Sequence, residues 1–220
     1  MNKEVKISEL YDCKVKYLES LFVGYEFPWE LLLQIKGCIY ELFNAKIEGY
    51  RFLKENVMIG ENVIIHSTAT IEGPAFIGSG SEVRAGAFIR GSVITGEGCV
   101  IGNSTEIKNS ILLDRVQIPH YNYVGDSILG NSAHMGAGAI CSNLKSDGTS
   151  VVIHADKDYH TGLRKVGAFL GDGADIGCGC VLNPGTVVGK NTSVYPLTAL
   201  RGVYEKNLIV KSAELAVPKK

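Results

Sequence analysis

Long apolar runs, an excess of positive charge and paired cysteines are all missing from this sequence. No apolar stretch reaches the roughly 20 residues that cross a bilayer as a helix. The formal net charge of the 220 residues is −1, so no basic face for nucleic acid is indicated. The opening MNKEVKISELYD carries charges where a secretory signal needs an apolar core. We therefore expect a cytoplasmic protein with no membrane or nucleic-acid partner.

The six cysteines form no C-x-x-C pair, and without an export signal they are expected to be reduced thiols. Cys178 and Cys180 are separated by a single residue, shorter than the usual spacing of paired zinc ligands, so they are not expected to bind a metal together. Also absent are a phosphate-binding glycine loop before a strand–helix unit and a G-x-S-x-G nucleophile elbow. In contrast, glycine is abundant, with 26 residues, whereas the sequence contains a single tryptophan. This abundance indicates many tight turns, and regular turns indicate a repeat.

A repeat of six residues dominates the middle of the chain. Nine of its first ten positions are aliphatic, and the remaining one, Thr95, is β-branched. The ten are Ile59, Ile65, Ile71, Ile77, Val83, Ile89, Thr95, Ile101, Ile107 and Leu113. The same step returns at Leu170, Ile176, Leu182, Val188 and Val194. Glycine often follows, as in Ile77-Gly78 and Val188-Gly189. A period of six fits neither an α-helix nor an ordinary alternating strand.

A prism with one hexapeptide per face and three faces per coil explains this period. The aliphatic residues point to the axis, glycine allows the corners, and coils stack at about 4.8 Å. The predicted fold class is therefore mainly β, a parallel β-helix. Between Leu113 and Val166 the phase falters, with Ile118 and Val124 one residue early.

Three regions are expected. Residues 1–55 carry helical spacing and are predicted to form an N-terminal helical cap packed across the open first coil, with Trp29 as a packing anchor. Residues 56–197 form the β-helix, with an inserted loop at 143–165. This loop is too long and polar for a coil corner, so it either serves function or a contact with a neighbour, or is a tolerated insertion. Residues 198–220 form a C-terminal segment.

Polar residues on the coils mark a candidate site. Arg90 and Lys108 are 18 residues apart, about one coil, so they are predicted to stack on one face. Two neighbouring cations repel unless an anion lies beside them, and phosphate is the natural anion. His120 and Tyr123 follow where the phase slips, which indicates a local distortion that exposes them.

One long segment resembles a known enzyme family. The stretch IGNSTEIKNSILLDRVQIPHYNYVGDSILGNSAHMGAGAICSN is similar to the acetyltransferase half of bifunctional glucosamine-1-phosphate acetyltransferase/N-acetylglucosamine-1-phosphate uridyltransferase. With the later GLRKVGAFLGDGADIG, it resembles the archaeal sugar-1-phosphate nucleotidyltransferase/acetyltransferase branch even more closely. The resemblance spans roughly residues 57–195 and does not include the nucleotidyltransferase half. It implies a left-handed parallel β-helix, although parallel crossovers are normally right-handed, and a homotrimer.

The resemblance also implies site residues. His120 matches the catalytic histidine of an H-x-x-Y-x-G-D segment, and Lys108, Tyr123, Asn143 and Arg90 match residues that hold the sugar phosphate. The backbone beside the acetyl group corresponds to Gly136, Ala137 and Gly138. Two positions depart from the bacterial pattern, which has asparagine at His134 and tyrosine at Leu144. Because those positions help to hold the sugar and acetyl-CoA, they leave the acceptor open.

The expected function is acetyl transfer from acetyl-CoA to the amine of an amino-sugar phosphate of the glucosamine-1-phosphate type. An ammonium has no lone pair, so His120 is expected to act as the general base, oriented by Asp126 or by a backbone carbonyl. A backbone N–H within Gly136–Ala139 is expected to meet the oxyanion. Arg201, Lys206 or Lys211 is expected to meet the phosphates of acetyl-CoA. No metal is required.

Three other functions remain open from the sequence. The fold also hosts zinc-dependent carbonic anhydrases, but no closely spaced histidine pair lies on a coil. A second alternative is a non-catalytic trimeric module that senses sugar phosphates or serves as a scaffold for a nucleotidyltransferase. A third is an acetyltransferase whose acceptor is a nucleotide-linked sugar or a hydroxyl.

Overall fold

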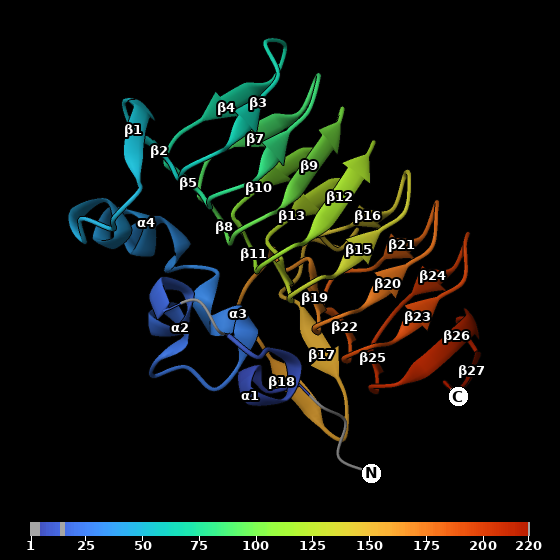
Figure 1. Ribbon diagram of the computed structural model, residues 1–220. Helices are drawn as coiled ribbons and strands as arrows, with labels where there is room; N and C mark the ends of the chain where they lie inside the picture. Colours follow the sequence, from blue (N-terminus) through green and yellow to red (C-terminus); the bar gives the residue numbers. More distant parts are fainter. Residues whose placement is uncertain (1–4, 14–15, 220) are drawn as a thin grey trace.

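The computed structural model describes residues 5–13 and 16–219 and shows a stack of three-sided coils with helices along one side (Figure 1). The coils form three sheets, which are parallel except for one terminal strand pair in each of the first two. Sheet 1 has the order β1 (Arg51–Lys54), β2 (Val57–Ile59), β5 (Ala75–Ile77), β8 (Val93–Thr95), β11 (Ser110–Leu112), β14 (Ile128–Leu129), β19 (Ala168–Leu170), β22 (Thr186–Val188) and β25 (Val203–Tyr204). Only its first pair, β1 with β2, is antiparallel.

The other two sheets complete each coil. Sheet 2 has the order β3 (Ile64–Ile65), β6 (Glu82–Val83), β9 (Val100–Asn103), β12 (Gln117–His120), β15 (His134–Met135), β20 (Asp175–Ile176), β23 (Ser193–Val194), β26 (Leu208–Ser212) and β27 (Leu215–Pro218). Sheet 3 has the order β4 (Thr70–Glu72), β7 (Phe88–Arg90), β10 (Glu106–Lys108), β13 (Tyr123–Gly125), β16 (Ile140–Cys141), β21 (Val181–Leu182) and β24 (Ala199–Leu200). This is the mainly β hexapeptide-coil β-helix that the sequence predicted.

The hexad residues fill the axis of the prism. Ile59, Ile77 and Ile101 belong to one continuous core cluster, together with most of the other predicted positions. Thr95 is also fully buried, and its hydroxyl accepts a hydrogen bond from the Gly78 N–H at 2.8 Å. Its β-branched side chain therefore keeps the packing shape while its polar atom is satisfied.

Two successive coils are each one residue short, and the first of them explains the phase slip at Ile118 and Val124. Ile118 pairs with Ile101 and Val124 with Ile107, each 17 residues away. The shortening begins earlier than the hexad count indicated, because Leu112, not Leu113, pairs with Thr95 and enters the axial core. The prediction that Leu113 points to the axis is therefore wrong. Its side chain is buried in a second cluster, outside the prism.

The helices cover the outer face of sheet 1, not the open first coil as the sequence predicted. They are α1 (Ile7–Leu10), α2 (Lys16–Phe22), α3 (Pro28–Leu31) and α4 (Ile35–Asn44). Outward residues at the middle of the strands, among them Phe76, Ile94 and Phe169, join the helices in the second cluster. Farther along the stack, the Asp172 N–H donates to Leu10 O at 3.0 Å. The edge of the first coil is covered by β1 instead.

The expected packing role of Trp29 is confirmed. Its ring is 6% exposed, stacks on Phe27 with centroids 4.7 Å apart, and lies 6.1 Å from Phe169. None of the helices in the described part of the chain combines the length and apolarity needed to span a membrane.

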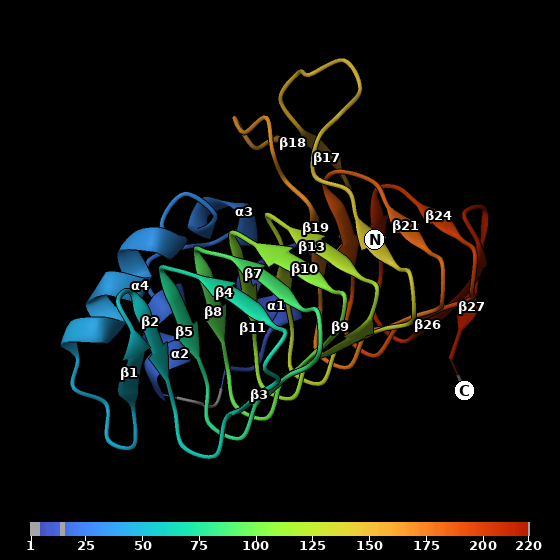
Figure 2. The same cartoon turned by 90° about the horizontal axis from the view of Figure 1, so that it is seen from above.

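The inserted segment leaves the stack and returns as a hairpin (Figure 2). Its strands β17 (Val152–His154) and β18 (Asp158–His160) pair antiparallel. Val151 and Ile153 are buried in the second cluster, and Tyr159 lies edge-on to Phe27, with ring centroids 5.3 Å apart. The insertion is therefore packed against the helices of the same chain.

Replacing Gly102 by alanine is expected to prevent folding or to lower the free energy of unfolding by more than about 3 kcal/mol, because overpacking here meets rigid backbone. A Cβ at this position would lie 1.6 Å from Pro119 O on the next coil. Gly162→Ala is the control, since its φ of +71° is unfavourable but nothing lies within 4 Å. It should cost only about 1 kcal/mol. Urea denaturation measures both, and a fully stable Gly102→Ala protein would contradict the close stacking.

Candidate active site

The outer face of sheet 3 carries the two cations predicted to stack. Arg90 ends β7 and Lys108 ends β10, and the pairing of Ile89 with Ile107 places them on neighbouring strands. Arg90 Nη1 lies 2.6 Å from Glu106 Oε1. Lys108 Nζ lies 3.4 Å from Asp126 Oδ2. Each cation thus has a protein carboxylate beside it, which offsets the repulsion that the sequence assigned to a bound anion alone.

Lys108, Tyr123 and Asn143 meet in one polar cluster around Asp126. The Asp126 residue is 5% exposed. Its Oδ1 accepts from Asn109 Nδ2 at 2.8 Å, and its Oδ2 accepts from Asn143 Nδ2. Asn143 Nδ2 also lies 3.3 Å from Tyr123 Oη. We call Lys108, Asn109, Tyr123, Asp126 and Asn143 the Asp126 cluster.

Tyr123 is held in its neutral form within this cluster. Burial raises the pKa of its phenol, and the negative charges of Asp126 and Glu106 raise it further. Because Asn143 Nδ2 already donates to Tyr123 Oη, the phenol keeps its own proton for donation elsewhere. Tyr123 therefore serves as a hydrogen-bond donor at neutral pH.

His120 lies on an adjacent corner, at the end of β12, and its side chain is exposed. Its ring makes no hydrogen bond within the part of the chain that the structure describes. Asp126 instead bonds Asn109, Asn143 and Lys108, so its proposed role in orienting His120 is not found here. The His120 backbone carbonyl accepts from the Gly138 N–H at 3.0 Å, which places the glycine turn on the next coil.

The turn from Gly136 to Ala139 contains one unused backbone donor. The N–H groups of Gly136, Gly138 and Ala139 donate to Ile176 O, His120 O and Gly136 O. The N–H of Ala137 makes no hydrogen bond with any described residue, and Ala137 is exposed. Of the four candidates for an oxyanion donor, Ala137 is therefore the one whose N–H is free.

Asn122 is a structural residue of this corner that the sequence analysis missed. It is 3% exposed, and its Oδ1 accepts from the His120 N–H at 3.1 Å. Its Nδ2 donates to Gly136 O at 2.8 Å. Asn122 thus ties the His120 corner to the glycine turn. In the sequence, its position between His120 and Tyr123 was the feature that could have indicated this structural role.

A groove of about 610 Å³ lies between the inserted segment and the coils that follow it in the sequence. Its basic lining residues are Lys145, His154 and Arg201. Lys108 pairs with Gly125 on the next strand of sheet 3. The pairings of the later strands of this sheet continue the same row across the coils to Asn183 and then to Arg201. Arg201 thus lies four coils from Lys108, or about 19 Å at the usual strand spacing. Its exposed guanidinium has no partner within residues 5–13 and 16–219.

The two positions that depart from the bacterial pattern lie apart from each other. His134 lies on sheet 2, where its Nδ1 is 2.8 Å from Asp175 Oδ1. Leu144 is 46% exposed and lines the groove. Among the described residues, no group of three or more His, Cys, Asp or Glu side chains is placed to hold a metal.

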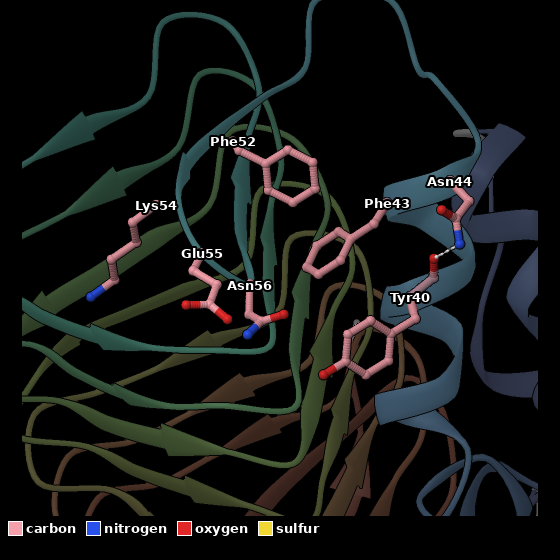
Figure 3. Close-up of a pocket in the computed structure, with 7 residues that line it drawn as sticks. All are labelled: Tyr40, Phe43, Asn44, Phe52, Lys54, Glu55 and Asn56. Carbon is pink, nitrogen blue, oxygen red and sulfur yellow. Dashed lines mark hydrogen bonds between the residues drawn. The ribbon is translucent and has the colours of Figure 1, made fainter.

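A second hollow, of about 410 Å³, lies between α4 and β1 and contains none of the predicted site residues (Figure 3). Tyr40, Phe43 and Phe52 give it an aromatic wall. It adjoins the first coils, whereas His120 and the Asp126 cluster lie on the coils from β10 to β16. The hollow therefore belongs to a different part of the molecule.

Comparison with known proteins found one family model and several relatives that match this chain. The family described as GMPPB C-terminal domain matches residues 71–157. Bifunctional protein GlmU of Methanococcus maripaludis is 42% identical over 197 residues, which cover 88% of this chain and 48% of that protein. The bifunctional sugar-1-phosphate nucleotidylyltransferase/acetyltransferase of Sulfurisphaera tokodaii is 36% identical over 97 residues, covering 44% of this chain and 24% of its own length. The chain thus spans about half the length of the first of these relatives.

The coils and the matches define a hexapeptide-repeat domain of the acyltransferase type. Over most of its own length the chain is similar to the GlmU proteins, and over a shorter part to the sugar-1-phosphate nucleotidylyltransferase/acetyltransferase protein, as the EIKNS and H-x-x-Y-x-G-D segments indicated.

Proposed function

We propose that this protein transfers the acetyl group of acetyl-CoA to the amine of an amino-sugar phosphate of the glucosamine-1-phosphate type. One observation carries the proposal: a histidine ring and a backbone N–H, both without a partner among the described residues, lie on stacked corners near a row that contains basic side chains. His120 and Ala137 supply the first pair, and Lys108 and Arg90 begin the row. The name of the Sulfurisphaera tokodaii relative, a sugar-1-phosphate nucleotidylyltransferase/acetyltransferase, supports acetyl transfer in the chemistry of sugar phosphates.

Lys108 and Arg90 bind the acceptor phosphate in this proposal. A phosphate dianion replaces part of their pairing with Asp126 and Glu106 and receives charge-assisted hydrogen bonds. The Tyr123 O–H and the Asn143 side chain lie beside Lys108 to bind sugar hydroxyls. Fixing the phosphate and the ring places the amine near the thioester, from which much of the rate enhancement arises.

His120 takes a proton from the acceptor amine as the nitrogen attacks the thioester carbonyl. The Ala137 N–H donates to the carbonyl oxygen as it gains negative charge. When the C–S bond breaks, the His120 imidazolium returns a proton to the sulfur, and free CoA and the N-acetyl sugar leave. Neither a metal nor a covalent enzyme intermediate enters this sequence.

The groove beside the inserted segment accommodates the phosphates of acetyl-CoA. Arg201, whose guanidinium has no partner among the described residues, lies on the row of Lys108, and Lys145 of the inserted segment supplies a second cation. We further propose a homotrimer. Ile140 and Val181, each 37% exposed, lie on the outer face of sheet 3 beside the site. A neighbouring prism would cover them and form the second wall of the groove.

The test follows free thiol release from acetyl-CoA. Glucosamine-1-phosphate, galactosamine-1-phosphate, nucleotide-linked amino sugars and free amino sugars are offered to the wild type, whose oligomeric state is measured in parallel. Turnover with an amino-sugar phosphate is expected. Turnover only with a nucleotide-linked sugar would show that the acceptor is a nucleotide-linked amino sugar and not a sugar phosphate. No turnover from a folded protein that also fails to bind CoA favours the sensing or scaffolding function.

Replacing Gly125 by alanine is expected to lower kcat/KM for the acceptor by about 10–100-fold, with a nearly unchanged melting temperature. A Cβ at Gly125 would lie 2.6 Å from Tyr123 Oη and 2.9 Å from Asn143 Nδ2. Both atoms are at the ends of movable side chains, so the side chains of Tyr123 and Asn143 are displaced while the coil remains folded. Steady-state kinetics and a thermal melt measure the two effects. Unchanged acceptor kinetics would show that Tyr123 and Asn143 do not bind the acceptor.

A further inference from the structure

Asp126 is a buried carboxylate whose two oxygens are both used by site residues. Its side chain is 7% exposed. Oδ1 accepts from Asn109, and Oδ2 accepts from Asn143 and lies 3.4 Å from Lys108 Nζ. A buried carboxylate is tolerated only with such partners, because losing water without them costs several kcal/mol. These contacts are therefore an integral part of the corner, not incidental surface pairs.

The same residue joins the two ends of the inserted segment. Asn143 begins the insertion and binds the Asp126 carboxylate. Where the chain returns, the Gly167 N–H donates to Asp126 O at 2.8 Å, and the Val166 N–H donates to Asn143 O at 3.0 Å. The root of the insertion is thus closed on Asp126 through one side-chain contact and one backbone contact.

This arrangement also sets the orientation of the Asn143 amide. Its Nδ2 faces Asp126 Oδ2 and Tyr123 Oη, so its Oδ1 is turned away from both. Oδ1 has no hydrogen-bond donor among the described residues and is available to accept from a sugar hydroxyl. Lys108, on a flexible four-carbon stem, is held by the same carboxylate.

We propose that Asp126 is a positioning residue of the acceptor site, which holds Lys108 and Asn143 in place and ties both to the root of the inserted segment. The inference rests on the proposed function, since it concerns the binding of the acceptor phosphate and sugar. Asp126 itself is too buried to touch the reacting atoms, so its effect passes through the two side chains that it holds.

Asp126→Asn tests this with little change in volume. The variant loses the charge that pairs with Lys108, and one amide group then faces another at Asn143 or at Asn109. We expect KM for the acceptor to rise about 10–100-fold, as for the loss of a charged hydrogen bond, with KM for acetyl-CoA changed less than about twofold. Amide hydrogen exchange across 143–167 should become faster.

Asp114→Asn is the matched control. Asp114 is 6% exposed and accepts the Glu97 N–H at 2.9 Å, on the corner that follows β11. This variant should lower the melting temperature without a change in either KM. An Asp126→Asn protein that behaves in the same way would overturn the proposal, because Asp126 would then be only structural. Unchanged hydrogen exchange across 143–167 would also overturn it.

Titration calorimetry with inorganic phosphate separates this inference from the proposed reaction. If the wild type transfers no acetyl group but binds phosphate, and Asp126→Asn binds it more weakly, the proposed function fails while the positioning role stands. Equal phosphate binding by both proteins overturns the positioning role. A wild type that binds no phosphate and acetylates no acceptor overturns both.

Discussion

Replacing His120 by alanine is expected to lower kcat for acetyl transfer by about 10²–10⁴-fold, the usual contribution of a general base. The imidazole is exposed at the end of β12 and unbonded within the described residues, so it is free to take the proton of an acceptor amine. Its removal leaves the corner intact, because Asn122 holds the backbone of His120 and not its ring. KM for both substrates should therefore change little, and thiol release measures the effect.

His160→Ala is the control for this result. His160 is also an exposed histidine at the end of a strand, but it lies on β18 in the inserted hairpin. It should retain full activity. Added imidazole should restore part of the rate to His120→Ala, since a small base can occupy the vacated space. A fully active His120→Ala protein would remove His120 from the mechanism.

Replacing Lys108 by alanine is expected to lower kcat/KM for the acceptor by about 100-fold, at the upper end for a hydrogen bond to a charged group. Lys108 is the less exposed of the two cations, with 20% of its side chain exposed against 44% for Arg90. A partly buried cation binds phosphate in a less screened environment, so its loss costs more. KM for acetyl-CoA should stay within about twofold. Steady-state kinetics with each substrate varied in turn measures both.

The Lys108→Ala/Asp126→Asn double variant separates binding from stability. Lys108→Ala alone leaves the Asp126 carboxylate buried without its cation, a change that is strongly destabilising in buried pairs. The double variant removes that unpaired charge and should recover melting temperature without recovering acceptor affinity. Arg84→Ala, whose pair with Glu82 is an exposed surface contact, should leave both unchanged. Recovery of acceptor affinity in the double variant would show that Lys108 does not bind the phosphate.

The hexad pattern predicted most of the axial core because an inward residue is needed every six positions. It was wrong at Leu113, since a coil of 17 residues moves Leu112 inward. A count along the chain cannot locate such a deletion until later residues appear out of phase. The position of the helices was likewise predicted wrongly. Their apolar faces match any apolar surface, and the second apolar surface, on sheet 1, is visible only when outward residues such as Phe76 and Phe169 are aligned across coils.

The residues of the site were also predicted only in part. The spacing of Arg90 and Lys108 placed them on one face, and the family resemblance brought Tyr123 and Asn143 to the same cluster as Lys108, which the structure shows. The partners of these residues were not predicted. Glu106 and Asp126 were not identified as the carboxylates beside the two cations, and Asn122 was not recognised at the His120 corner.

The sequence by itself determined the period, the coil and the residues that the family resemblance selects, because each depends on residue type at a regular spacing. The tertiary structure alone decided which carboxylate holds Lys108, which N–H remains free at Ala137 and where the inserted segment closes. These features depend on contacts between residues one coil or more apart, as between Asn143 and Asp126. Such contacts exist only after stacking has set the height and direction of every side chain.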